Sequence, residues 1–116
     1  MIGPLVDRPT HPSTWSYHSS DGMGLLEFLM WCEDLHMGPV LAVYAGYSLG
    51  GQVVKPGPDL DAYVKDALDE IEYVTGQANT KWGALCARDG HPRSFQIALR
   101  GSGERITTSA SRVCLT

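Results

Sequence analysis

An uninterrupted apolar run is the feature that most restricts how this chain can fold. Residues 40–45, VLAVYA, are apolar throughout, with Gly38-Pro39 before them and Gly46 after them. A run without alternation of polar and apolar residues predicts a strand buried on both faces, as in parallel sheets. Such a strand needs other strands at its edges and helices over its faces, so the sequence predicts an α/β protein.

One helix is expected before this strand and another after it. Residues 23–37 place apolar side chains at helical spacing, with Asp21 as the expected N-terminal cap and Gly38 at the C-terminal end. A longer helix is expected to begin at Asp59 and to end before Gly76. The apolar face of this second helix is predicted to comprise Leu60, Val64, Ala67, Leu68, Ile71 and Val74.

A third, shorter helix is predicted over residues 81–88, capped by Thr80 and stopped by Gly90. A His-Pro turn then leads into a second apolar start at residues 95–97. The order of helix, strand, long helix, short helix and incipient strand is typical of an α/β barrel or a doubly wound sheet. One complete strand and the start of another cannot close a barrel of eight.

The first twenty residues carry three prolines and no sustained period. They are predicted to form an irregular loop in which Trp15 and Tyr17 act as anchors. A loop of this length normally connects two elements, so we expect further structure upstream of it. No charged head followed by an apolar core is present, so no signal peptide is predicted.

Composition limits the classes of partner. A chain of 116 residues with 43% apolar content is expected to form one modest domain. The net charge of -4 gives no reason to expect nucleic acid or an anionic membrane surface. No apolar run approaches the roughly 18 residues that span a bilayer. Neither nucleic acid nor a membrane is therefore predicted as a partner.

The metal-ligating residue types show no ligand pattern, so no metal and no other cofactor is predicted. Cys32, Cys86 and Cys114 are widely spaced and are expected to be buried free thiols. The histidines without ligand spacing are His11, His18, His36 and His91.

The composition changes near residue 98. Residues 88–116 contain five of the nine basic residues, and the last seventeen residues are dominated by Ser, Thr, Gly and Arg. Few of these side chains can fill a core, so the end of the chain is expected to be a solvated, irregular tail. We therefore expect a folded part, residues 1–97, and a divergent tail, residues 98–116.

Several motifs occur together in one order, namely IGPLVDRP, GLLEFL followed by WCEDL, GPVLAVYAGYSLGG and WGALCARDGHP. Together they resemble the catalytic-barrel portion of glycoside hydrolase family 51, the α-L-arabinofuranosidases, in its fungal form. The resemblance covers about residues 2–97. It implies a partial (β/α)8 barrel of about one and a half βα units, which is here a fragment of the catalytic domain.

The resemblance also implies a chemistry. Family members remove terminal α-L-arabinofuranosyl groups from arabinan, arabinoxylan and related polysaccharides, with retention of configuration and without a metal. Retaining hydrolysis uses two carboxyl groups about 5 to 5.5 Å apart. Members of the family are often extracellular, but the localisation of this chain stays open.

The expected acid/base glutamate is missing. In the family it ends a strand within a motif of the form YVE[VI]GNE, whereas here residues 98–106 read ALRGSGERI. With one choice of codons, the same bases read one nucleotide later give Arg-Tyr-Val-Glu-Val-Gly-Asn-Glu. We therefore hypothesise that residues 98–116 are out of frame. Glu104 is interpreted as a tail residue, and no catalytic residue is assigned in this chain.

The remaining candidates are few. Barrel enzymes place their sites at the C-terminal ends of strands, which favours Tyr44, Tyr47 and Ser48 as the positions nearest a sugar pocket. The tyrosines are the substrate-binding candidates because aromatic rings stack on sugars, although Tyr44 can equally pack between strand and helix. Glu27 is either a functional acid or, as we favour, a structurally paired or solvated glutamate.

Two hypotheses remain open. In the first, the chain is a fragment of an arabinofuranosidase that is inactive by itself. In the second, it is a small non-catalytic α/β binding or interaction domain derived from a barrel segment. Both leave strand edges unpaired, so self-association through these edges is expected.

Overall fold

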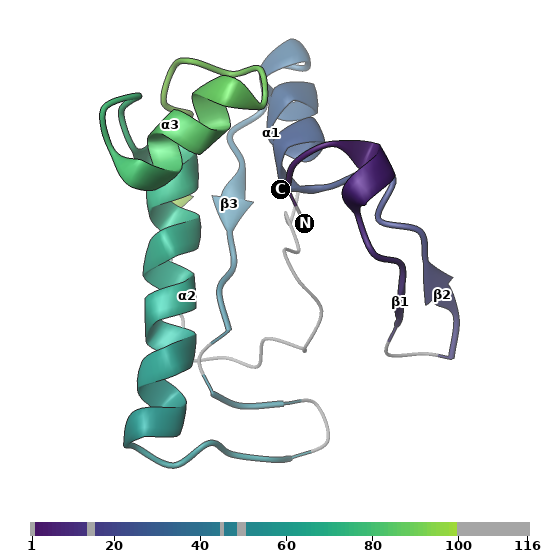
Figure 1. Cartoon of the computed structure of the whole chain (residues 1–116), viewed down its shortest axis with the longest axis vertical. Helices are drawn as coiled ribbons and strands as arrows, with labels where there is room; N and C mark the ends of the chain where they lie inside the picture. Colours follow the sequence, from purple (N-terminus) through teal and green to yellow (C-terminus); the bar gives the residue numbers. More distant parts are fainter. Residues whose placement is uncertain (1, 14–15, 45, 49–50, 100–116) are drawn as a thin grey trace.

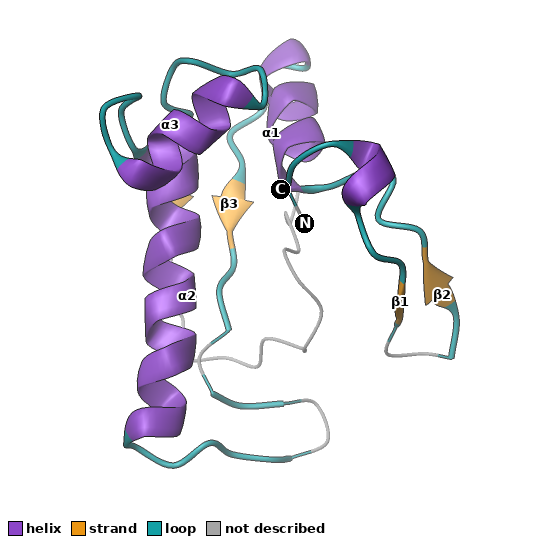
Figure 2. Ribbon diagram, in the orientation of Figure 1, coloured by secondary structure: helices purple, strands orange, loops and turns teal. Residues whose placement is uncertain are grey.

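The computed structural model describes residues 2–13, 16–44, 46–48 and 51–99 (Figure 1). Three helices carry most of the regular structure, and the strands are short (Figure 2). The chain is a small α/β structure, as the sequence predicted. In order, its elements are η1 (Leu5–Asp7), β1 (His11–Pro12), β2 (His18–Ser19), α1 (Leu25–Asp34), β3 (Val40–Leu41), α2 (Pro58–Thr75), α3 (Lys81–Arg88) and β4 (Ala98–Leu99).

The central feature is a parallel pair of strands joined by a helical crossover. Strand β3 pairs with β4 in parallel, with Val40 opposite Ala98 and Leu41 opposite Leu99. Helices α2 and α3 form the connection between the two strands. In Figure 1, β3 lies between α1 and α2. This is a β-α-β unit, the building block of parallel sheets.

The buried strand is shorter than the sequence predicted. The prediction of a strand over residues 40–45 is wrong beyond Leu41, where β3 ends, because the ladder extends only as far as β4 pairs with it. The predicted strand start at residues 95–97 is also too early. The Phe95 N–H instead donates to the Val74 carbonyl at 2.9 Å, which fixes this segment to the end of α2.

Helix α1 begins and ends inside its predicted range. Its N-terminal cap residue is Gly24 rather than Asp21, and the Glu27 carboxylate accepts a hydrogen bond from the Gly24 N–H at 2.8 Å. At the other end, His36 adopts the left-handed conformation that we expected of Gly38, with a φ of 55°. Both predicted caps of this helix are therefore wrong.

Helix α3 matches its prediction at both ends. It spans Lys81–Arg88, and the Thr80 hydroxyl accepts a hydrogen bond from the Gly83 N–H at 3.2 Å. Helix α2 begins at Pro58, one residue before the predicted start at Asp59. The two helices meet closely at Gly83, because a Cβ atom there would lie 2.7 Å from the carbonyl carbon of Gly76.

The core lies between α1, β3, the C-terminal half of α2 and α3. Its buried residues are Leu25, Leu26, Leu29, Leu41, Tyr73, Val74, Cys86 and Phe95. The predicted apolar face of α2 is buried only near its C-terminal end. Val64 is 49% exposed and Leu68 is 60% exposed, although Tyr44 packs on Tyr63 in the same half of the helix.

The free cysteines follow the prediction where the structure describes them. Cys32 and Cys86 are buried and free, and Cys114 lies outside the described residues. Within the described part of the chain, no helix is long and apolar enough to span a bilayer. The same residues contain no group of three or more histidine, cysteine, aspartate or glutamate side chains placed to hold a metal.

The N-terminal segment is more regular than the sequence indicated. Strands β1 and β2 form a short antiparallel hairpin with His11 opposite Ser19. Tyr17 is 55% exposed and is therefore not the anchor that we predicted. Trp15 lies outside the described residues. Ile2 packs against the core, and Arg8, whose side chain is only 4% exposed, joins this segment to α1.

Candidate functional site

The chain direction defines which end of the structure is relevant for ligands. Helix α1 leads through the short connection 35–39 into β3, so the start of α1 and the end of β3 lie at the same end of the unit. In α/β sheets, ligands bind outside the carboxyl ends of the strands. The segments at this end are the β1–β2 hairpin before α1 and the loop that follows β3.

Tyr44 and Tyr47 both follow β3, but they have different surroundings. The Tyr44 ring contacts the ring of Tyr63 on α2 edge-on, with 4.8 Å between the centroids. Tyr47 is 39% exposed and forms an isolated antiparallel bridge with Val53. Tyr44 thus packs against a helix, whereas Tyr47 is partly exposed to solvent. Ser48 is buried, and its hydroxyl donates a hydrogen bond to the Gln52 carbonyl oxygen at 3.4 Å.

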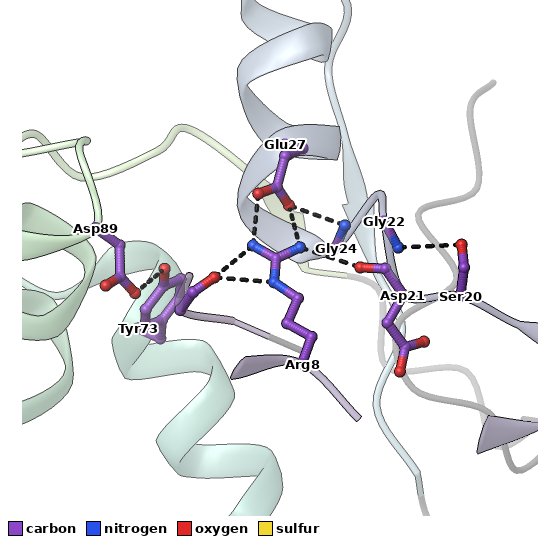
Figure 3. A network of polar contacts seen from close by, with 9 residues as sticks. Arg8, Ser20, Asp21, Gly22, Gly24, Glu27, Tyr73 and Asp89 are labelled. Atoms are coloured by element: carbon purple, nitrogen blue, oxygen red, sulfur yellow. Dashed lines mark hydrogen bonds and ion pairs between the residues drawn. The ribbon is translucent and has the colours of Figure 1, made fainter. Parts of the chain in front are cut away.

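Arg8 is the centre of a polar network at the start of α1 (Figure 3). Its guanidinium donates to both carboxylate oxygens of Glu27, at 2.6 and 3.0 Å. It also donates twice to the Gly3 carbonyl, at 2.8 and 2.7 Å, and once to the Asp21 carbonyl at 3.2 Å. Glu27 is therefore a structurally paired glutamate, the alternative that we favoured.

The pairing of Arg8 with Glu27 changes the ionisation of both groups. The hydrogen bond from Arg8 outweighs the burial of Glu27 and holds its pKa below the ordinary value. The same hydrogen bond raises the pKa of Arg8. A carboxylate held ionised in this way cannot supply the proton that a general acid donates.

A second group of polar side chains lies in the β1–β2 hairpin. His11 Nδ1 is 3.0 Å from Asp21 Oδ1, and the Ser19 hydroxyl donates to the same oxygen at 3.1 Å. Burial opposes ionisation of Asp21, but the hydrogen bonds from His11 and Ser19 outweigh it, and its pKa lies below the ordinary value. In Figure 3 the Asp21 carboxylate points away from Arg8, so only its backbone joins the two groups.

Two further polar pairs lie toward α3 and are structural. The Tyr73 hydroxyl donates to the Asp89 carboxylate at 3.0 Å, and burial together with this bond raises the pKa of Tyr73 far above its ordinary range. His91 Nε2 lies 2.8 Å from Glu33 at the end of α1, and the His91 ring stacks on Phe95. These pairs tie the α3–β4 connection to α1 and α2.

A cavity of about 510 Å³ lies between the N-terminal segment and α3. Arg8, Glu27 and Asp89 are among its lining residues, and each of them already has a charged or hydroxyl partner. The cavity thus offers a ligand few unpaired polar groups. It is a gap between packed elements rather than a built binding site.

Tyr44 and Tyr47 follow β3, as the sequence indicated, and their assignment to a sugar pocket stays a prediction. A second group of polar residues was not predicted. The pairing of His11 with Asp21 was missed because the two residues lie on opposite sides of a hairpin that the sequence did not predict. Predicting the hairpin would have brought His11 and Asp21 together, but strands of two residues leave no periodic pattern in the sequence.

Comparison with known proteins establishes the family. The profile of the α-L-arabinofuranosidase 1 domain matches residues 1–109. The chain belongs to this family, and the predicted resemblance to the family 51 α-L-arabinofuranosidases is confirmed. The match extends past residue 97, where we expected the tail to begin.

Individual relatives agree with this assignment. The chain is 45% identical over 100 residues to a probable α-L-arabinofuranosidase A of Aspergillus terreus, covering 84% of this chain and 16% of that protein. It is 41% identical over 100 residues to α-L-arabinofuranosidase A of Aspergillus niger, with the same coverage of 84% and 16%. The chain thus spans about 16% of the length of these relatives.

Solved structures show the same likeness in three dimensions. An arabinose-bound family 51 α-L-arabinofuranosidase superimposes with a TM-score of 0.76 and 41% identity, over 84% of this chain and 16% of that chain. The α-L-arabinofuranosidase of Thermotoga maritima, in an arabinose complex, gives a TM-score of 0.68 at 25% identity. The superposition covers 89% of this chain and 19% of that chain.

Proposed function

We propose that this chain is a segment of the catalytic domain of a retaining α-L-arabinofuranosidase, the enzyme that releases terminal α-L-arabinofuranosyl groups from arabinan, arabinoxylan and similar polysaccharides. The observation that carries the proposal is the superposition on an arabinose-bound family member with a TM-score of 0.76 at 41% identity. The substrate of the whole enzyme is accordingly an arabinose-containing polysaccharide or oligosaccharide.

Within this proposal, residues 1–97 form part of a (β/α)8 barrel, about one and a half βα units. The parallel pair of β3 and β4 with its helical crossover supports this assignment, because consecutive strands of such a barrel are parallel neighbours. Helix α1 then belongs to the preceding βα unit and leads into β3.

The segment is proposed to be inactive by itself. Retaining hydrolysis needs one carboxyl group that is protonated and a second that attacks, about 5 to 5.5 Å away. In the described residues, Glu27 is paired with Arg8, Asp21 with His11 and Glu33 with His91. None of these three is free for either role. Turnover of an arabinofuranoside that copurifies with the chain would contradict this part of the proposal.

A chimeric enzyme tests the function directly. Residues 2–97 of this chain replace the matching segment of the Aspergillus niger α-L-arabinofuranosidase A, and release of arabinose from arabinan is measured. Activity within about tenfold of the parent enzyme is expected, because the segment contributes strands and loops but no catalytic carboxylate. A folded chimera without activity contradicts the proposal. The control replaces the segment by its own sequence in shuffled order, which is expected to abolish folding.

Tyr44 and Tyr47 are proposed as substrate-binding residues of this enzyme. The exposed ring of Tyr47 supports its direct contact with sugar, and the contact with Tyr63 supports a role for Tyr44 in shaping the same wall. In the chimera, Tyr47→Ala is expected to raise KM for arabinan several-fold while Tyr47→Phe leaves it near the parent value. Equal KM values in all three proteins contradict the assignment.

Residues 98–116 are proposed to be an out-of-frame tail. Its first two residues, Ala98 and Leu99, form β4 rather than the irregular tail that we expected, and residues 100–116 lie outside those that the structure describes. The support for the proposal is the shifted reading that yields the family motif. Sequencing the locus and its transcript tests it. Finding Gly-Asn-Glu codons one nucleotide out of frame is the expected result, and an in-frame coding sequence without them in any frame overturns the proposal.

The alternative of a non-catalytic binding domain is not favoured by the comparisons, in which the named relatives are arabinofuranosidases. Urea unfolding of the purified chain separates the two. A fragment is expected to bind apolar dyes before its unfolding transition, because it leaves apolar surface uncovered. A transition without dye binding by the folded chain instead favours an autonomous domain.

A further inference from the structure

The β1–β2 hairpin contains a histidine that is held by a buried carboxylate. His11 Nδ1 lies 3.0 and 3.1 Å from the two carboxylate oxygens of Asp21. The Asp21 side chain is 1% exposed, and the His11 side chain is 33% exposed. The Ser19 hydroxyl donates to Asp21 and fixes the carboxylate from a second side. A buried acid thus orients a ring that reaches the solvent.

This contact determines which ring nitrogen is free. An ionised carboxylate can only accept hydrogen bonds, so Nδ1 of His11 carries the hydrogen. Nε2 then lies on the side of the ring directed away from Asp21. No hydrogen bond to this nitrogen occurs within the described part of the chain. His18 on the same hairpin differs, because its Nε2 lies 2.7 Å from the Thr10 hydroxyl.

The backbone of Asp21 adopts an unfavourable conformation in the contact with His11. Asp21 has a φ of 55°, in the left-handed region that residues other than glycine rarely adopt. Such conformations persist only where the surrounding contacts fix them, and they concentrate at functional sites. The sequence predicted that Asp21 caps α1, yet the helix uses Gly24 for that role. The side chain of Asp21 instead accepts a hydrogen bond from His11 Nδ1.

The position of the hairpin relates it to the sugar site. It directly precedes the start of α1, and so it lies at the same end of the unit as the residues that follow β3. The hairpin belongs to a sheet of its own, separate from β3 and β4. Under the proposed function the terminal sugar is bound at the strand ends, so a hairpin outside that sheet is placed to meet the rest of a polysaccharide.

We propose that His11, oriented by Asp21, binds the saccharide on the leaving-group side of the scissile bond, with Nε2 hydrogen-bonded to a sugar hydroxyl group. The inference rests on the proposed function and specifies one substrate contact of that enzyme. Asp21 is a positioning residue, since its contact with substrate is through the histidine ring. Sugar hydroxyl groups suit this site because each can both donate and accept a hydrogen bond, and so can pair with either form of Nε2.

The test uses the chimeric enzyme described above with two substrates. Arabinotriose carries sugar on the leaving-group side, whereas 4-nitrophenyl α-L-arabinofuranoside does not. His11→Ala is expected to lower kcat/KM for arabinotriose about tenfold, the usual effect of one lost hydrogen bond, and to leave the nitrophenyl substrate unchanged. Asp21→Asn is expected to raise KM for arabinotriose with little change in kcat. His18→Ala is the matched control and is expected to alter neither substrate.

The outcomes separate the inference from the function on which it depends. An active chimera in which His11→Ala and His11→Gln leave arabinotriose hydrolysis unchanged overturns the inference alone. Equal losses on both substrates also overturn it, because they indicate a structural role or a contact with the terminal sugar. A folded but inactive parent chimera overturns the proposed function and the inference together. Thermal midpoints of all variants identify any loss that comes from unfolding.

Discussion

Arg8 and Glu27 form a two-point ion pair, with Nη2–Oε1 at 2.6 Å and Nη1–Oε2 at 3.0 Å, that joins the N-terminal segment to the first turn of α1. The Arg8 side chain is 4% exposed and the Glu27 side chain is 33% exposed. Every donor that this arginine directs inward meets an acceptor, from Glu27 or from a backbone carbonyl. The pair therefore organises the end of the unit where the hairpin and α1 meet.

Removal of the carboxylate is expected to destabilise the chain. Glu27→Ala leaves the guanidinium buried without its charged partner and also removes the acceptor of the Gly24 N–H. Because Glu27 is partly exposed, we expect a loss of about 2 kcal/mol in the free energy of unfolding, below the range for fully buried pairs. Urea unfolding at pH 7 measures it. The control Lys65→Ala breaks an exposed pair with Asp69 and should produce no measurable change.

The same ion pair predicts a dependence of stability on pH. The pKa of Glu27 is lowered in the folded chain, so its contribution is fully present above the ordinary glutamate pKa of about 4.3. The contribution is lost as the pH falls through the lower, folded-state pKa. Unfolding free energies measured between pH 7 and pH 2 should therefore fall more steeply below about pH 4 for the unsubstituted chain than for Glu27→Gln. Parallel curves contradict the assignment.

The cap of α3 offers a local test. Thr80→Ala removes the hydroxyl that accepts the Gly83 N–H, and the expected loss is about 1 kcal/mol. Thr75→Ala is the control, because its hydroxyl bonds the Ile71 carbonyl inside a helix and caps nothing. The thermal midpoint should drop for Thr80→Ala and stay nearly constant for Thr75→Ala.

The close contact of α2 with α3 predicts that one glycine cannot be replaced. In isolation, Gly83→Ala favours a helix by about 1 kcal/mol. Here the added methyl group would meet the Gln77 carbonyl and lie 2.7 Å from the carbonyl carbon of Gly76, all of which is backbone. We expect a net loss of about 3 kcal/mol. Gly38→Ala, which meets nothing within 4 Å, is the matched control and should be neutral or slightly stabilising.

The uncovered half of α2 predicts self-association of the isolated chain. Val64 and Leu68 are 49% and 60% exposed on this helix, and β3 carries an edge without a described partner. The double variant Val64→Lys with Leu68→Lys is expected to shift sedimentation toward the monomer. Ala62→Lys, on an exposed position of the same helix, tests whether added charge alone produces the shift.

Local signals predicted the helices well. The apolar period and the Thr80 cap defined α3 to the residue, since both depend only on neighbouring positions. The caps of α1 were predicted wrongly for the opposite reason. Asp21 has the right residue type for a cap, but distant contacts with His11 hold it in another conformation. A tertiary contact of this kind leaves no trace in the spacing of residues along the chain.

The sequence by itself determined the α/β class, the order of the three α-helices and of β3, the family, and the position of Tyr44 and Tyr47 after that strand. These properties follow from local periodicity, from strand direction and from motifs that are contiguous in the chain. Only the tertiary structure decided that Arg8 pairs with Glu27, that Asp21 orients His11, and that the apolar run pairs over two residues only, Val40 and Leu41. Each of these depends on groups brought together across a hairpin or a crossover, and their distances are set by packing rather than by sequence separation.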